Sequence, residues 1–179
     1  FAGAINQQAK TDKLDAQLIA YYAEVMKPDL SQIKPEDIRL MSDFLSRRRQ
    51  LMEMQTMEKN RLQIMPKEIT QFIKPILTVL KKQLDKIEEK MMKIIDNCDE
   101  YKAKSDIIQS MPGAGKVIAV SLISNFPELG YLSNKQAAAL VGVAPINKES
   151  GKYEGKRKIR GGRSQIRTVM YMGMMSGIR

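Results

Sequence analysis

A sustained heptad pattern of apolar residues constrains this chain more than any other feature of its sequence. Successive apolar positions are separated by four or three residues, and they are Ile73, Leu77, Leu80, Leu84, Ile87, Met91, Ile94 and Cys98. Lysine, glutamate and glutamine fill most of the positions between them. Such an a/d pattern predicts a long helix that packs against at least one other helix.

A second long helix is expected before this one. It starts at Pro35-Glu36 and ends at Pro66, and its apolar face is predicted to hold Leu40, Phe44, Leu51 and Met54. Pro75 is expected to delay the start of the heptad helix. The two helices could fold back as an antiparallel hairpin or extend and pair with a second subunit, and the sequence does not choose. A coiled-coil homodimer is the commonest solution of the second kind.

Composition favours a mostly α fold. Aromatic residues make up 6% of the chain and Trp is absent, which argues against a large β-sandwich core. The single cysteine, Cys98, excludes an internal disulfide and fits a reducing cytoplasm. No apolar run is long enough to span a bilayer, so no membrane partner is expected. Phe1 starts the sequence without an initiator Met, which suggests that the chain begins within a longer protein.

We expect three parts: residues 1–35, a long-helix part over 36–104, and a small helical domain over 105–179. Thr11 is the expected N-cap of a helix in the first part. In the third, Ser133 to Gln136 form a capping-box pattern, and Gly142 is expected to help end the helix that follows. Residues 147–162 are expected to form a basic loop or short hairpin before a last helix that begins near Ser164 and is expected to continue past Arg179.

The charge of the chain favours a polyanionic partner. The net charge is +10, and between Pro145 and Arg179 nine basic residues face only two acidic ones, Glu149 and Glu154. Positive charge concentrated in this way favours nucleic acid over an acidic membrane surface as that partner. The basic residues of this segment that we expect at phosphates are Lys148, Lys152, Lys156, Arg157, Lys158, Arg160, Arg163 and Arg167.

The absence of histidine narrows the chemistry that the chain can perform. It excludes a histidine general base, a Cys-His nucleophile and most zinc sites. Asp12 and Asp15 lie three residues apart at a predicted helix start, so both carboxylates share a face and could reach Mg²⁺. Two carboxylates are too few for a tight site, and acids in a first helical turn are also common without a metal.

The glycine-rich turn Pro112-Gly113-Ala114-Gly115-Lys116 lies between two expected helices. It resembles the turn of helix-hairpin-helix DNA-binding motifs, in which glycines let backbone N–H groups approach a phosphate. We therefore expect Gly113, Gly115 and Lys116 at nucleic acid. An ordinary helix–helix turn is the alternative.

Ser150 stands beside Gly151 in the basic segment, with Lys148 and Lys152 on either side. A serine that attacks a phosphodiester needs an exposed hydroxyl, nearby cations and a backbone free to move the reacting oxygen into line. The local sequence is compatible with these needs, although a serine in a turn is more often structural.

Taken in order, these motifs resemble one family: the insertion-sequence transposases that join an N-terminal RuvC-like (DEDD) domain, through a coiled coil, to a C-terminal domain with a catalytic serine. The resemblance spans nearly the whole chain. Its motifs are Lys10-Thr11-Asp12-x-x-Asp15-Ala16, Arg47 to Leu51, Lys59 to Leu62, Met111 to Gly115, Leu140 to Pro145, Ser150-Gly151, Arg160 to Arg163, and Arg167.

The resemblance implies roles that composition and spacing do not establish. Asp12 and Asp15 would be the last two of four acidic Mg²⁺ ligands, and Ser150 the nucleophile that becomes joined to DNA. Members of the family use a guide RNA encoded by the element, the bridge RNA, and act as dimers that assemble further on DNA. The other two acids would lie before Phe1, so we expect this piece alone to be inactive. In the cell we expect it in the cytoplasm, on the nucleoid when bound. A non-catalytic helix-hairpin-helix DNA-binding module is the alternative function.

Overall fold

The computed structural model describes residues 11–28, 34–150 and 153–178, and within these ranges the side chains of residues 148–150, 153 and 154 are outside the description. The chain divides into two compact units, Phe1–Lys34 and Pro35–Arg179. The first contains helix α1 (Asp12–Met26). Its predicted N-cap is confirmed, because the Thr11 hydroxyl oxygen accepts a hydrogen bond from the backbone N–H of Leu14 at 3.3 Å.

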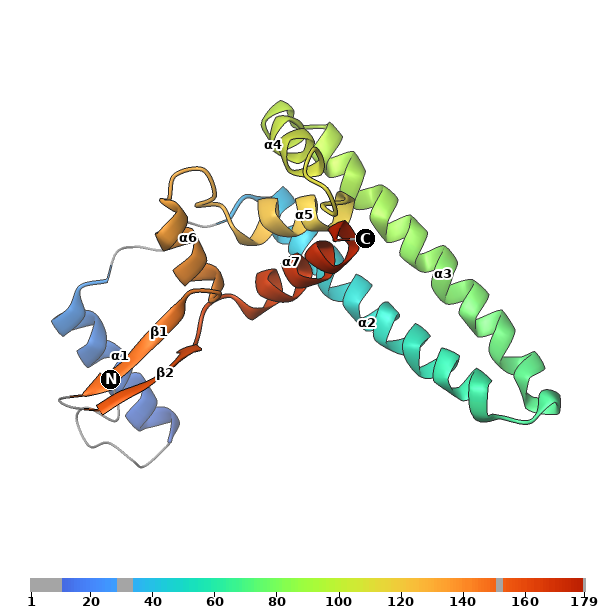
Figure 1. Ribbon diagram of the computed structural model, residues 1–179, viewed down its shortest axis with the longest axis horizontal. Coiled ribbons are helices and arrows are strands. Elements are labelled where there is room, and N and C mark those ends of the chain that lie inside the picture. Colours follow the sequence, from blue (N-terminus) through green and yellow to red (C-terminus); the bar gives the residue numbers. More distant parts are fainter. Residues whose placement is uncertain (1–10, 29–33, 151–152, 179) are drawn as a thin grey trace. The chain divides into compact units, whose positions relative to one another are not determined.

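The second unit confirms the mostly α prediction. Its helices are α2 (Glu36–Ile64), α3 (Lys67–Asp96), α4 (Asp99–Gln109), α5 (Lys116–Asn125), α6 (Asn134–Val141) and α7 (Ser164–Gly177). Two short strands, β1 (Pro145–Ser150) and β2 (Tyr153–Ile159), lie between α6 and α7 (Figure 1). The predicted boundary between residues 104 and 105 falls inside α4.

Helices α2 and α3 lie side by side as an antiparallel hairpin (Figure 1). Of the two arrangements that the sequence left open, the structure therefore has the intramolecular one. Pro66 separates the helices as predicted, since α2 ends at Ile64 and α3 begins at Lys67. The expected delay at Pro75 is wrong, because this residue lies inside α3. Its ring faces solvent, and a proline costs the helix one backbone hydrogen bond.

The buried faces differ in detail from those predicted. On α2 the buried residues are Ile38, Met41 and Leu51, whereas Leu40 and Met54 are 42% and 44% exposed. On α3 the pattern moves by one residue at its end, where Ile95 is buried and Ile94 only half-buried. The reason is that this end of α3 also packs against α4 and α5, so burial there follows several neighbours and departs from a single two-helix seam.

Helix α5 lies at the centre of the second unit, in contact with α2, α3, α4 and α7. A helix surrounded in this way must be apolar on most sides, and Ala119, Val120, Leu122 and Ile123 are all buried. The buried hydroxyl of Ser124 donates a hydrogen bond to the backbone oxygen of Val120 at 2.7 Å, which satisfies it inside the core. Helix α5 is therefore the central helix against which the neighbouring helices pack.

Local signals after α5 are confirmed. Ser133 and Gln136 form the predicted capping box of α6, and Gly142 ends that helix in the left-handed conformation with φ of 82°. The segment predicted as a basic loop or short hairpin is an antiparallel hairpin, so the loop alternative is wrong. Pairing of basic strands is possible here because the side chains of Lys156 to Arg160 all reach solvent.

Candidate nucleic-acid interface and catalytic hairpin

The hairpin of β1 and β2 carries the candidate nucleophile at the end of its first strand. Ser150 is paired with Tyr153, and the hydroxyl and the lysines Lys148 and Lys152 lie outside the described side chains. The register changes between Ile146 and Lys148, so that two residues of β2 lie opposite one of β1. Such a bulge bends a hairpin and increases its twist. The bulge therefore bends the ribbon between its base and the Ser150 end.

Exposed cations accompany this hairpin. Lys156, Arg157, Lys158 and Arg160 are all exposed along β2 and just after it. Cations on a solvated two-stranded ribbon can contact the phosphates of a nucleic acid. They do not require the large desolvation free energy of buried ions. Their assignment to nucleic acid stays a prediction.

Gly113 serves the packing of the protein. It has φ of 82°, and its backbone lies directly against that of α7. A Cβ atom at Gly113 would overlap the carbonyl oxygen of Gly173 and lie 2.9 Å from the backbone nitrogen of Gly177. Helix α7 thus packs directly against the turn at Gly113 and leaves no space there for a side chain. Gly115 differs, because no atom lies within 4 Å of the position that its Cβ would take.

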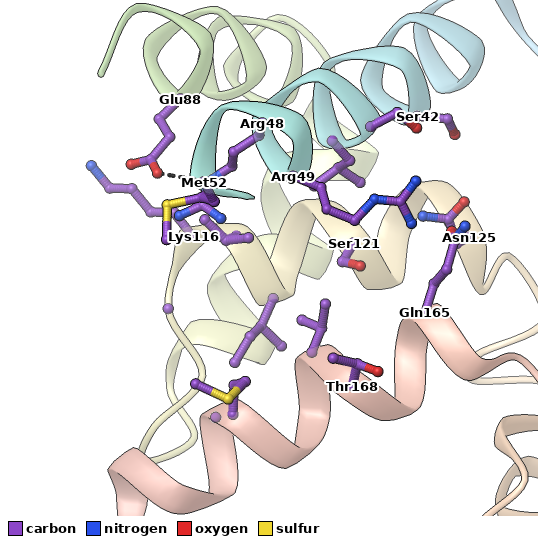
Figure 2. A pocket seen from close by; sticks show the side chains of 18 of the residues that line it. Ser42, Arg48, Arg49, Met52, Glu88, Lys116, Ser121, Asn125, Gln165 and Thr168 are labelled. Atoms are coloured by element: carbon purple, nitrogen blue, oxygen red, sulfur yellow. Dashed lines mark hydrogen bonds and ion pairs between the residues drawn. The ribbon is translucent and has the colours of Figure 1, made fainter. Parts of the chain in front are cut away.

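A pocket of about 870 Å³ lies between α2, α5 and α7. Figure 2 shows that α2 supplies Ser42 and Arg49 to one side, that α7 supplies Gln165 and Thr168 to the other, and that Ser121 of α5 lies between them. The predicted residues Gly113, Gly115 and Lys116 also line this pocket. The structure therefore brings the glycine-rich turn together with the arginine run of α2.

The pocket carries positive charge at its rim. The side chain of Arg49 is 60% exposed, and its Nε lies as far as 4.0 Å from the nearest carboxylate oxygen of Glu53. The Nε of Arg48, by contrast, lies 2.7 Å from the carboxylate of Glu88. Lys116 is exposed, and no ion pair involves it within the part of the chain that the structure describes. Sequence reasoning did not select Arg49. The signal was the run Arg47-Arg48-Arg49, but the side of α2 that faces α5 and α7 was not evident without the fold.

Arg163 and Arg167, both expected at phosphates, contact the protein itself. The guanidinium of Arg163 donates two hydrogen bonds to the carboxylate of Glu128, at 2.5 and 2.6 Å, and it lies over the ring of Phe126. The hydrogen bond to Glu128 raises the pKa of Arg163 above its ordinary value, so this side chain stays charged. Arg167 donates to backbone oxygens at both ends of the β-hairpin. Neither set of contacts favours a phosphate role.

Comparisons with known proteins match the chain at both ends. The family model "Transposase IS116/IS110/IS902 family" matches residues 105–179, and the DEDD transposase model of the IS110 group matches residues 1–70. The chain belongs to the IS110 family of transposases. This assignment confirms the resemblance drawn from the motifs. The chain is also similar to the pilin gene-inverting proteins of Moraxella bovis and Moraxella lacunata, each 22% identical over 96% of the chain. It spans about half the length of these relatives, 54% in both cases.

The IS110-family match places Asp12 and Asp15 within the DEDD model. Both residues lie in the first turn of α1, where Asp12 is exposed and Asp15 half-buried. Among the described residues, no group of three or more His, Cys, Asp or Glu side chains could hold a metal ion. Two carboxylates do not make a Mg²⁺ site by themselves. No described helix is long and apolar enough to cross a membrane.

Proposed function

We propose that the whole protein is a DNA transposase or site-specific recombinase that cleaves and rejoins strands through a covalent bond between Ser150 and DNA. The order of the two family matches along the chain supports this proposal, together with the similarity to proteins named for inverting pilin genes. The position of Ser150 on an exposed basic hairpin is compatible with it.

In the proposed reaction, the Ser150 hydroxyl oxygen attacks the phosphorus of a phosphodiester. A bond forms between this oxygen and phosphorus, and the bond from phosphorus to the leaving sugar oxygen breaks. The hydroxyl proton is lost to solvent, and the leaving sugar oxygen takes up a proton. Rejoining is the reverse, with a sugar hydroxyl of another strand attacking the phosphoserine. Positive charge near the phosphate stabilises the charge that develops in both steps. We expect Lys156, Arg157 and Lys158 to supply part of it.

The function is tested by trapping the covalent complex. Full-length protein is incubated with Mg²⁺, the RNA encoded by its element and end-labelled DNA that carries the ends of the element, and the mixture is then denatured and digested. We expect a denaturation-resistant species whose nucleotide-bearing peptide contains Ser150. A guide RNA is proposed as a second polyanionic partner, so ribonuclease treatment before addition of DNA should prevent formation of the species. Attachment at another residue would contradict the serine mechanism, and a complex that resists ribonuclease would contradict RNA guidance.

We infer that the pocket between α2, α5 and α7 contacts the backbone of the nucleic acid through Arg49 and Lys116. Arg49→Ala and Lys116→Ala should each weaken binding and lower the slope of log affinity against log salt by about one, because each removes one phosphate contact. Fluorescence anisotropy over a salt series measures both quantities. Lys82→Ala, on the exposed surface of α3, is the matched control and should leave the slope unchanged. An equal slope in all four proteins would exclude the pocket as a phosphate contact.

The proposed homodimer has a surface in the half of the α2–α3 hairpin nearest Pro66, which we call the distal face. On α3, Ile69, Phe72, Ile76 and Val79 are between 45% and 67% exposed. On α2, Met54, Met57 and Ile64 are between 44% and 77% exposed. Meanwhile α2 directs the polar residues Gln55 and Glu58 to half-buried positions. This half of the hairpin therefore leaves more apolar side chains outside than two helices usually do.

The exposed apolar residues of α2 and those of α3 lie on the same side of the hairpin. Phe72 and Ile76 each precede by one residue a position that faces α2, and Met54 and Met57 each precede one that faces α3. One residue rotates a helix position by about 100°. The two helices run in opposite directions, and their facing positions point towards each other. A step back by one residue therefore turns the exposed apolar residues of both helices to the same side of the hairpin. A face two helices wide fits a second copy, since a twofold pairing buries the distal face of both at once as a four-helix bundle.

Phe72→Glu should therefore weaken dimerisation of the full-length protein. A charge in the centre of the distal face must be desolvated when two copies meet, which costs several kcal/mol. Sedimentation velocity over a concentration series measures the shift towards monomer. Ile107→Glu is the matched control, because Ile107 is 70% exposed and Phe72 67%, and Ile107 lies on α4 away from this face. A dimer that survives Phe72→Glu, or that is lost equally with Ile107→Glu, would exclude this surface.

A further inference from the structure

The β-hairpin that carries Ser150 has little packing of its own. Within the described part of the chain, β1 and β2 contact each other, and neither makes an extensive contact with a helix. Ile146 and Ile159, on opposite strands near its base, are 53% and 54% exposed. A ribbon without extensive contact to the helices cannot fix its own direction relative to them. Its direction must be set where it leaves α6 and where it enters α7.

Arg167 joins the two ends of the hairpin to each other. One nitrogen of its guanidinium, Nη1, lies 3.3 and 3.2 Å from the backbone oxygens of Val141 and Gly142, just before β1. The same nitrogen lies 3.0 Å from the oxygen of Gly161, just after β2. Hydrogen bonds from a charged donor are stronger than those between neutral groups. A single side chain of α7 therefore holds both backbone segments at the base of the ribbon.

The backbone at this base is packed without room for side chains. A Cβ atom at Gly162 would lie 2.5 Å from the Cα of Gly142, and one at Gly142 would lie 2.5 Å from Nη1 of Arg167. The backbone N–H of Arg163 also donates to the oxygen of Leu140 at 3.0 Å. The end of α6 and the start of α7 are thus in direct backbone contact, which keeps the entry and exit of the hairpin at a fixed separation.

Arg163 attaches this base to the body of the unit. Besides its two hydrogen bonds to Glu128, its guanidinium donates to the backbone oxygen of Asn125 at 2.9 Å, at the end of α5. Its Cζ atom lies 5.6 Å from the centre of the Phe126 ring, which is itself buried. A cation over a ring and a bidentate ion pair both depend on orientation. Together they fix the start of α7 against the end of α5.

From these contacts we propose that Arg163, Arg167 and Glu128 are positioning residues that set the direction of the Ser150 hairpin relative to the α5 to α7 helices. The proposal rests on the proposed function, because it assigns them a role in bringing Ser150 to the phosphate. It replaces the phosphate contacts expected for the two arginines. Misplacement of a reacting group by about 1 Å can slow a reaction about a hundredfold. Loosening the base should therefore slow the chemistry more than the binding.

The test uses Arg163→Ala in the full-length protein. We expect faster amide hydrogen exchange in β1 and β2 with α3 unchanged, and a rate of covalent adduct formation at saturating DNA lowered about tenfold to a hundredfold. The salt slope of DNA binding should stay the same. Arg39→Ala, an exposed arginine of α2 that removes the same charge, should change neither exchange nor rate. Unchanged exchange combined with a slope lowered by about one would show a phosphate contact and overturn the proposal.

Glu128→Gln provides a second variant in case Arg163→Ala disturbs the fold. A carboxylate repels phosphates, so its neutralisation cannot remove a contact to a phosphate. A slower adduct rate with equal or tighter DNA binding therefore supports positioning, and an unchanged rate contradicts it. Hydrogen exchange separates this proposal from the serine mechanism. If adduct formation survives Ser150→Ala, the proposed nucleophile is wrong while the exchange result still tests the attachment. If exchange is normal in both variants, the positioning role is wrong whatever Ser150 does.

Discussion

Ser150→Ala in the full-length protein is expected to abolish the covalent protein–DNA adduct while leaving DNA affinity within about twofold of the parent. Alanine lacks the oxygen that forms the bond to phosphorus, so no residual rate through this intermediate is possible. The affinity should persist because most of the free energy of nucleic-acid binding comes from contacts between phosphates and cations, which the substitution leaves in place. Adduct formation is measured on denaturing gels and affinity by anisotropy.

Ser110→Ala is a suitable control for the loss of a serine hydroxyl. Ser110 is exposed after α4, and its hydroxyl donates only to the nearby backbone oxygen of Ile107, at 2.7 Å. Adduct yield should be unaffected in this variant. An adduct of undiminished yield in Ser150→Ala would exclude this serine as the nucleophile. Loss of DNA binding together with the adduct would instead show that Ser150 acts through the structure of the complex.

Local features of the fold could be predicted because their causes lie within a few residues. The N-cap at Thr11 and the capping box of Ser133 and Gln136 each depend on a side chain and a backbone group three residues away. The left-handed end of α6 at Gly142 and the break at Pro66 follow from the backbone preferences of single residues. The heptad pattern likewise predicted a long paired helix, which is α3.

Features that depend on distant partners could not be predicted in the same way. Arg163 and Arg167 belong to a basic segment, and nothing local distinguishes an arginine that meets phosphate from one that meets Glu128. The face of α2 was misplaced at Leu40 and Met54, because this helix packs against α3 and, at one end, against α5. The sequence therefore predicted the order of the motifs along the chain. Only the fold shows which of their charged side chains contact the protein and which face solvent.

Gly113→Ala tests whether this glycine of the predicted phosphate-binding turn serves packing. We expect a loss of about 2–5 kcal/mol in the free energy of unfolding, from two additive causes. The backbone at Gly113 has φ of 82°, which costs a residue with a Cβ roughly 1–2 kcal/mol. The new methyl group would also overlap the Gly173 carbonyl and force α7 away from the turn, at a cost of about 1–3 kcal/mol. Urea denaturation of the full-length protein, followed by hydrogen exchange in α7, measures both effects.

Two other glycines separate these causes. Gly130 has φ of 100° with no atom within 4 Å of its Cβ position, so Gly130→Ala should show the backbone cost alone, about 1–2 kcal/mol. Gly115 has φ of −84° and equally open surroundings but is the N-cap of α5, so Gly115→Ala should show only the loss of a glycine cap, about 0.5–1 kcal/mol. If Gly113→Ala lowers the free energy of unfolding no more than Gly130→Ala does, α7 causes no steric overlap with a side chain at the turn. The turn would then be free to meet a phosphate, and the helix-hairpin-helix interpretation of Gly113 would regain its support.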